Sequence, residues 1–114
     1  MLNHVVLLKF KPDVADGDIE QLEERLDDLP NKISEILVYE FGRNIIPSER
    51  AYDFALVSLF ANQESLERYR VHPDHVVVLE KIKGMCEQVV TADFLGSDAG
   101  SIKGNTPDMA LPRF

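Results

Sequence analysis

Residues 3–11 read NHVVLLKFK, and this run of β-branched and large apolar side chains predicts the first strand of the fold. Pro12 and Asp13 follow directly and end it. Side chains on a strand alternate between its two faces. One face carries His4, Val6, Leu8 and Phe10, and the other carries Val5 and Leu7. Because both faces are largely apolar, we expect both to be covered.

The next segment has the periodicity of an amphipathic helix. Its apolar residues recur at spacings of three, four and three: Ile19, Leu22, Leu26 and Leu29. Asp16 or Gly17 is the expected N-cap, and Pro30 is expected to end the helix. Three further strands are predicted over residues 35–45, 52–60 and 86–95, the first two forming a hairpin.

A second helical region lies between residues 62 and 85 and is expected to be broken. Asn62 is the predicted N-cap of its first part, which carries Leu66 and Tyr69. The segment HPDH at 72–75 interrupts the helix, because the residue before a proline resists helical geometry. Asp74 is expected to cap the second part. The predicted apolar face of that part is Val76, Leu79 and Ile82.

The order of elements is therefore β-α-β-β-α-β, the ferredoxin-like arrangement of the α+β class, with an antiparallel sheet and the helices on one side. Residues 1–95 are expected to form this single domain, and residues 96–114 an irregular or disordered tail. Helices on one side leave the other sheet face bare, and a second copy of the chain is the simplest cover. The alternative is that the tail folds back over the sheet.

Composition limits the partners and the compartment. The chain has 114 residues with 12 Lys and Arg against 20 Asp and Glu, a net charge of −8, which disfavours binding to nucleic acid. No run approaches the roughly 18 apolar residues needed to span a membrane, so no membrane association is expected. Cys86 is the single cysteine, which precludes an intramolecular disulfide and favours the cytosol.

Histidine and tyrosine are the candidate catalytic residues. A histidine in an apolar pocket can act as a general base near neutral pH, and a tyrosine can donate a hydrogen bond to a developing oxyanion. His75, Tyr69 and His4 are placed for these roles if the first strand faces the HPDH corner. Two alternatives remain open. The same residues can cap the broken helix and satisfy buried polar atoms, or His4, His72 and His75 can bind a metal.

Several segments together resemble the stress-responsive A/B barrel domain, or dimeric α/β-barrel (Dabb), family. They are HVVLLKFK at 4–11, FGRNI at 41–45, YRVHPDH at 69–75 and TADF at 91–94. The resemblance spans about residues 2–95 and implies a homodimer whose two sheets form a barrel. It also implies a pocket for a small molecule between sheet and helices in each subunit.

The resemblance further implies roles for individual residues. A plant member of the family is a polyketide cyclase that uses a tyrosine and a histidine matching Tyr69 and His75, with a pocket histidine matching His4. His72 and the inward side chains of the first strand, Val6, Leu8 and Phe10, are then expected to contact the ligand. The function expected is that of a cofactor-free cyclase, lyase or isomerase. The alternatives are a non-catalytic, stress-protective or ligand-binding dimer, and a metal-dependent or monooxygenase-like relative.

Overall fold

The structure is a computed structural model that describes residues 1–96. The elements in this part of the chain are β1 (Leu2–Phe10), α1 (Asp16–Lys32), β2 (Val38–Arg43), β3 (Phe54–Phe60), α2 (Gln63–Val71), α3 (Pro73–Met85) and β4 (Cys86–Leu95). The order is the predicted β-α-β-β-α-β, with the second helix divided into α2 and α3. The prediction for 96–114 falls outside the described residues, except for Gly96.

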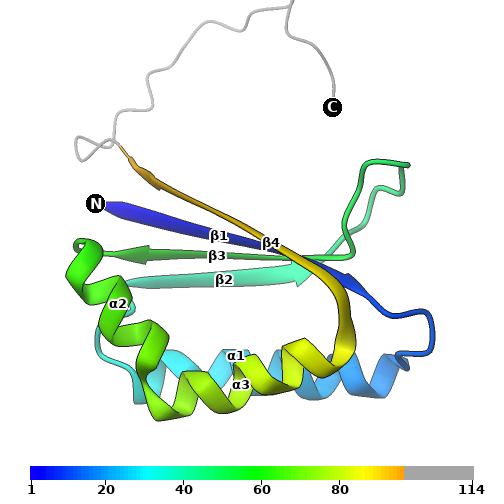
Figure 1. Ribbon diagram of the computed structural model, residues 1–114, viewed down its shortest axis with the longest axis horizontal. Helices are drawn as coiled ribbons and strands as arrows, with labels where there is room; N and C mark the ends of the chain where they lie inside the picture. Colours follow the sequence, from blue (N-terminus) through cyan, green and yellow to red (C-terminus); the bar gives the residue numbers. More distant parts are fainter. Residues whose placement is uncertain (97–114) are drawn as a thin grey trace, which may run out of the picture.

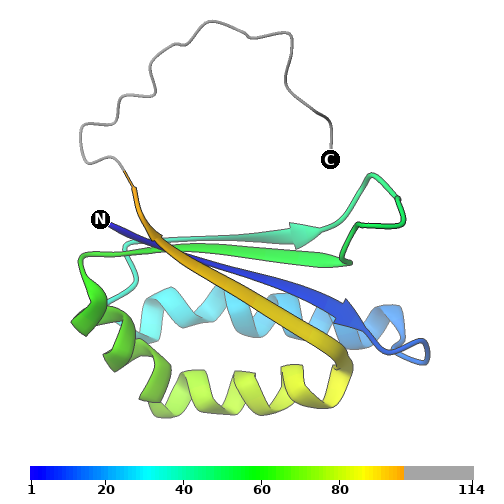
Figure 2. The same ribbon diagram turned by 45° about the horizontal axis from the view of Figure 1, so that its top comes forward.

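The sheet has the strand order β2-β3-β1-β4, and every neighbouring pair is antiparallel. All three helices of the described part lie on one side of it, with α1 beside α3 (Figures 1 and 2). The ferredoxin-like α+β fold is thus confirmed. None of these helices has the length and apolar character needed to cross a membrane.

The alternation along β1 is as predicted. Leu2, His4, Val6 and Leu8 are buried on the helix side, while Val5 and Leu7 are half-buried on the other side. The helix side holds the core, to which α1 contributes Leu22, Leu26 and Leu29. Removing this apolar surface from water is the main stabilising term of a domain of this size.

The ends of α1 differ from the prediction. The N-cap is Ala15, whose N–H donates to the Asp18 carboxylate at 3.1 Å, so Asp16 and Gly17 lie inside the helix. Pro30 does not end the helix, which continues to Lys32. A proline in the last turn removes only one helical hydrogen bond. The buried Leu29 and Ile33 hold the turn in place on either side of it, and the Ile33 N–H donates to the Leu29 carbonyl at 2.9 Å.

The hairpin strands are shorter than predicted. The predicted range 35–45 contains a strand only over Val38–Arg43, and 52–60 only over Phe54–Phe60. Before β2, the Ile36 N–H donates to the Ile33 carbonyl in a turn that leaves α1. After β2, the loop with Pro47 leaves the sheet and projects to the side opposite the helices (Figure 1).

The break between α2 and α3 lies at the predicted place. Asn62 caps α2 as expected, its side chain accepting from Ser65 N at 2.9 Å. The cap of α3 is His72 instead of Asp74. Pro73 has no N–H, so the first free donor of α3 is Asp74 N, which donates to His72 Nδ1 at 3.2 Å.

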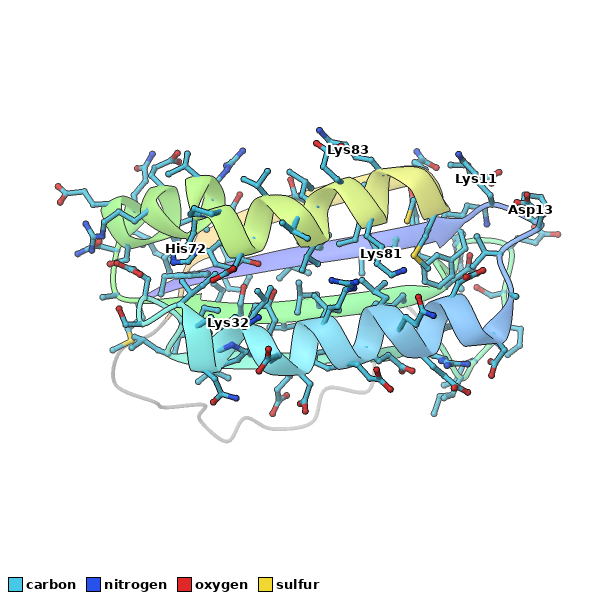
Figure 3. All side chains as sticks on the ribbon, turned by 90° about the horizontal axis from the view of Figure 1, so that it is seen from below. Lys11, Asp13, Lys32, His72, Lys81 and Lys83 are labelled. Atoms are coloured by element: carbon cyan, nitrogen blue, oxygen red, sulfur yellow. The ribbon has the colours of Figure 1, made fainter. Side chains whose placement is uncertain are left out.

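The buried face of α3 also differs from the prediction. It is formed by Val78, Ile82 and Met85, whereas Val76 is 40% exposed. Because α3 lies beside α1, the side chains directed between these helices and the sheet are the buried ones. Lys81 reaches across the surface between the two helices, where its Nζ donates to Gln21 Oε1 at 3.3 Å (Figure 3).

Candidate active site

A cavity of ≈ 460 Å³ lies between the helix side of the sheet and the helices α2 and α3. Its walls are mainly apolar and come from all seven helices and strands of residues 1–96. The polar groups inside are His4, Tyr39, Tyr69 and His75, and Glu67, Arg70 and Thr91 are exposed residues at its edge. Sites for small molecules typically have this character, with few polar groups on an apolar lining.

The structure brings four of the seven predicted site residues to this cavity: His4, Val6, Tyr69 and His75. The other three lie elsewhere. Leu8 is only 1% exposed in the core, and Phe10 packs against Phe54 at 6.0 Å between ring centroids. His72 lies at the corner between α2 and α3, where it caps α3 (Figure 3). These three residues are therefore not wall residues of the cavity. Leu8 and Phe10 pack with the core, and His72 caps α3.

His75 has the geometry of a general base. Its Nδ1 lies 3.0 Å from the Arg70 carbonyl oxygen. A carbonyl only accepts, so Nδ1 carries the proton and Nε2 keeps its lone pair. Burial lowers the pKa of His75 from its ordinary value, and the nearby Arg70 guanidinium lowers it further, against the opposing effect of the backbone hydrogen bond. The imidazole is therefore unprotonated at neutral pH and ready to accept a proton.

Tyr69 stands beside this base. Its ring is 1% exposed and packs against the His75 ring at 4.2 Å between centroids. Its hydroxyl forms a 2.7 Å hydrogen bond with the hydroxyl of Tyr39 on β2. Burial raises the pKa of Tyr69 to about 12, although the Tyr39 hydrogen bond lowers it. Burial also raises the pKa of Tyr39. Either hydroxyl can donate in this pair, and when Tyr39 donates, the Tyr69 proton is free for a ligand.

Two contributors to the site were missed in the sequence. Tyr39 lies on the helix side of β2 with Phe41, a spacing of two that the strand pattern contains. Asp93 on β4 pairs with His4 across the ladder, its Oδ1 lying 2.5 Å from His4 Nδ1. Assigning the faces of β2 and β4, and not only of β1, would have placed both side chains on the helix side of the sheet, though not beside their partners.

The three histidines do not form one metal site. His4 is bound to Asp93, His72 caps α3 and His75 is bound to the Arg70 carbonyl. Within residues 1–96 no group of three His, Cys, Asp or Glu side chains is arranged to hold a metal ion. The three-histidine alternative therefore has no geometric support in this part of the chain.

The sequence model of the Stress responsive A/B Barrel Domain, Dabb, matches residues 2–95, nearly all of the described chain. The chain belongs to this family. The domain protein DABB1 of Arabidopsis thaliana is 28% identical over 102 residues, which cover 87% of this chain and 49% of DABB1. The chain thus spans about half the length of that relative.

Two further relatives cover most of both chains. Olivetolic acid cyclase of Cannabis sativa is 22% identical over 95 residues, which cover 82% of this chain and 94% of the cyclase. A crystal structure from Thermobifida fusca, described as a dimeric ferredoxin-like protein of unknown function, is 30% identical with a TM-score of 0.76. It covers 82% of this chain and 88% of its own.

Proposed function

We propose that this protein is a homodimeric, cofactor-free enzyme that binds a small carbonyl compound in the cavity and removes a proton from the carbon beside the carbonyl group. One observation carries the proposal. The unprotonated Nε2 of His75 and the hydroxyl of Tyr69 meet in one apolar cavity, with their rings 4.2 Å apart. Cyclases, lyases and isomerases that act on carbonyl compounds can all begin with this step.

The chemistry divides between the two residues. His75 Nε2 takes the proton as the C–H bond breaks, and the electron pair of that bond forms the C=C bond of an enolate. Negative charge then grows on the carbonyl oxygen, where the Tyr69 hydroxyl donates a hydrogen bond. Returning the proton from the imidazolium to the product restores the starting state of the enzyme.

The walls of the cavity favour the same step. Apolar side chains such as Val6, Leu56 and Ile82 exclude water, which strengthens the hydrogen bond to the enolate oxygen. A volume of ≈ 460 Å³ lies within the roughly 300–1,000 Å³ typical of small-molecule sites. The name of the related olivetolic acid cyclase gives independent support, because it describes an enzyme that closes a ring.

The bare face of the sheet supports the dimer. It carries apolar side chains from all four strands, among them Val38, Val57 and Phe94, which are 45%, 42% and 53% exposed. Monomers seldom leave so much contiguous apolar surface in water. The related Thermobifida structure is described as dimeric. A second copy placed against this face would leave the cavity on the helix side open. The cytosolic location expected from composition stays a prediction.

Deuterium exchange tests the proposal directly. A compound that copurifies with the protein would be identified by mass spectrometry and then incubated with the protein in D₂O. We expect deuterium at the carbon beside the carbonyl group, at a rate well above that without protein, and no such gain with the His75→Ala variant. Binding without exchange in the wild-type protein would instead identify a non-catalytic ligand-binding dimer.

A further inference from the structure

A second imidazole reaches the cavity from the sheet, whereas His75 reaches it from α3. We infer that Asp93 is a positioning residue that makes His4 a second proton-transfer group of the cavity. This inference rests on the proposed function and adds to it both a residue and a second proton transfer. It begins from a contact between the neighbouring strands β1 and β4.

The backbone fixes this contact. His4 and Asp93 are direct partners in the antiparallel β1–β4 ladder, so their side chains leave the sheet on the same side and close together. His4 Nδ1 and Asp93 Oδ1 are 2.5 Å apart. The His4 residue is 7% exposed, and its ring lies edge-on to Phe60 and Tyr69 with centroids 6.4 and 6.3 Å away. The packing and the carboxylate together restrict the ring to one orientation.

The carboxylate also selects the tautomer of His4. An ionised carboxylate only accepts hydrogen bonds, so Nδ1 carries the proton of the neutral ring and Nε2 keeps the lone pair. This Nε2 makes no hydrogen bond to residues 1–96. In the same part of the chain, no buried side-chain nitrogen or oxygen lacks a hydrogen-bond partner. His4 Nε2 must therefore be open to accessible space, and the space that His4 lines is the cavity.

The cavity then holds two separately anchored bases. The Arg70 carbonyl holds His75, and the Asp93 carboxylate holds His4. His75 takes the proton from carbon, while His4 Nε2 accepts a proton from a second acidic group of the same substrate and returns it when the reaction ends. Two proton transfers at different atoms are what ring closure or isomerisation of a carbonyl compound requires, whereas enolate formation alone requires one.

The tautomer of His4 is measurable without a substrate. Long-range ¹H–¹⁵N spectra of the full-length, ¹⁵N-labelled protein distinguish a ring with Nδ1–H from one with Nε2–H. We expect His4 to be the Nδ1–H form in the wild type and to become mainly Nε2–H in Asp93→Ala, while His75 keeps its Nδ1–H form. Glu87→Ala removes another carboxylate from β4 and should change neither ring. A His4 tautomer that is the same in wild type and Asp93→Ala would overturn the inference.

Turnover separates this inference from the proposed function. Asp93→Ala should lower consumption of the copurified compound by a factor of about 10², the lower end of what a positioned acid–base group contributes. Deuterium exchange beside the carbonyl group requires only His75 and should stay within a few-fold of wild type. If Asp93→Ala retains full turnover, the inference fails and the proposed function stands. If the wild type shows no exchange, both fail.

Discussion

The two faces of the sheet have similar apolar content but different surroundings. On β3, Leu56 is 4% exposed beneath the helices and lines the cavity, while the next residue, Val57, is 42% exposed on the bare face. The alternation of a strand thus gives one face to the core and the candidate active-site cavity, and the other to the proposed contact with a second copy. The comparison indicates that assembly and chemistry can be changed separately by substitutions one residue apart.

Val57→Asp should have the largest effect of these substitutions. Its effect should be confined to the proposed contact made by the bare face. Placing a polar group in an apolar contact without a partner costs roughly 2–7 kcal/mol, an ionised carboxylate costs more, and each dimer would contain two. We expect the variant to elute as a folded monomer in size-exclusion chromatography with light scattering. Val57→Ala is the matched control and should remain dimeric. A Val57→Asp protein that stays dimeric would place the interface on another surface.

The effect of His75→Ala should be confined to the cavity and its surroundings on the helix side of the sheet. Removing a positioned general base should lower turnover by about 10²–10⁴. The variant also loses the hydrogen bond to the Arg70 carbonyl, so the free energy of unfolding should fall by about 0.5–1.5 kcal/mol. The oligomeric state in light scattering should not change.

His72→Ala is the control for this variant, since it lies in the same HPDH segment but caps α3 outside the cavity. Loss of a helix cap should cost about 0.5–2 kcal/mol, measured by urea unfolding, with turnover close to wild type. If both variants lose stability and neither loses turnover, His75 has a structural role only.

Much of the fold was predictable because periodicity is local. The β1 faces, the apolar stripe of α1 and the break before Pro73 all follow from the spacing of a few neighbouring residues. The ends of elements were less predictable, because packing decides them. Pro30 remains helical between the buried Leu29 and Ile33, and Val78 takes the core position expected for Val76.

The site was only partly predictable, because only some of its contacts join residues that are close together in the sequence. His75 and Tyr69 lie six residues apart, so a helical break was enough to suggest that they meet. Asp93 is 89 residues from His4 in sequence, and Tyr39 is 30 residues from Tyr69. The β1–β4 register brings the first pair together, and the packing of α2 on the sheet brings the second pair together. No local pattern in the sequence contains that information.

Tyr69→Phe should have a smaller effect than His75→Ala and tests the donor within the cavity. Loss of one hydrogen-bond donor to an oxyanion typically costs about 10²–10³ in kcat. Tyr39→Phe is the matched control, since it removes the other hydroxyl of the 2.7 Å pair. It should lower kcat much less, because the Tyr69 proton still reaches the ligand. Equal losses of kcat in the two variants would contradict the assignment of Tyr69 as the donor.

The smallest effect should be that of pH on stability, and its direction follows from His75. Burial lowers the pKa of this imidazole in the folded chain below its ordinary value of 6.5. Above that value neither state binds the proton, and the shift contributes nothing. As the pH falls below it, the unfolded chain binds a proton that the folded chain does not, so the free energy of unfolding decreases until the lower, folded pKa is passed. Turnover should fall only as the pH approaches the lower, folded pKa, because the protonated imidazole of the folded protein cannot accept a proton. Urea unfolding at a series of pH values, compared between wild type and His75→Ala, isolates this contribution. The difference in unfolding free energy between the two proteins should shift in favour of the variant as the pH falls below 6.5. A difference that is constant with pH would mean that His75 titrates alike in both states, and that the cavity does not keep this imidazole neutral.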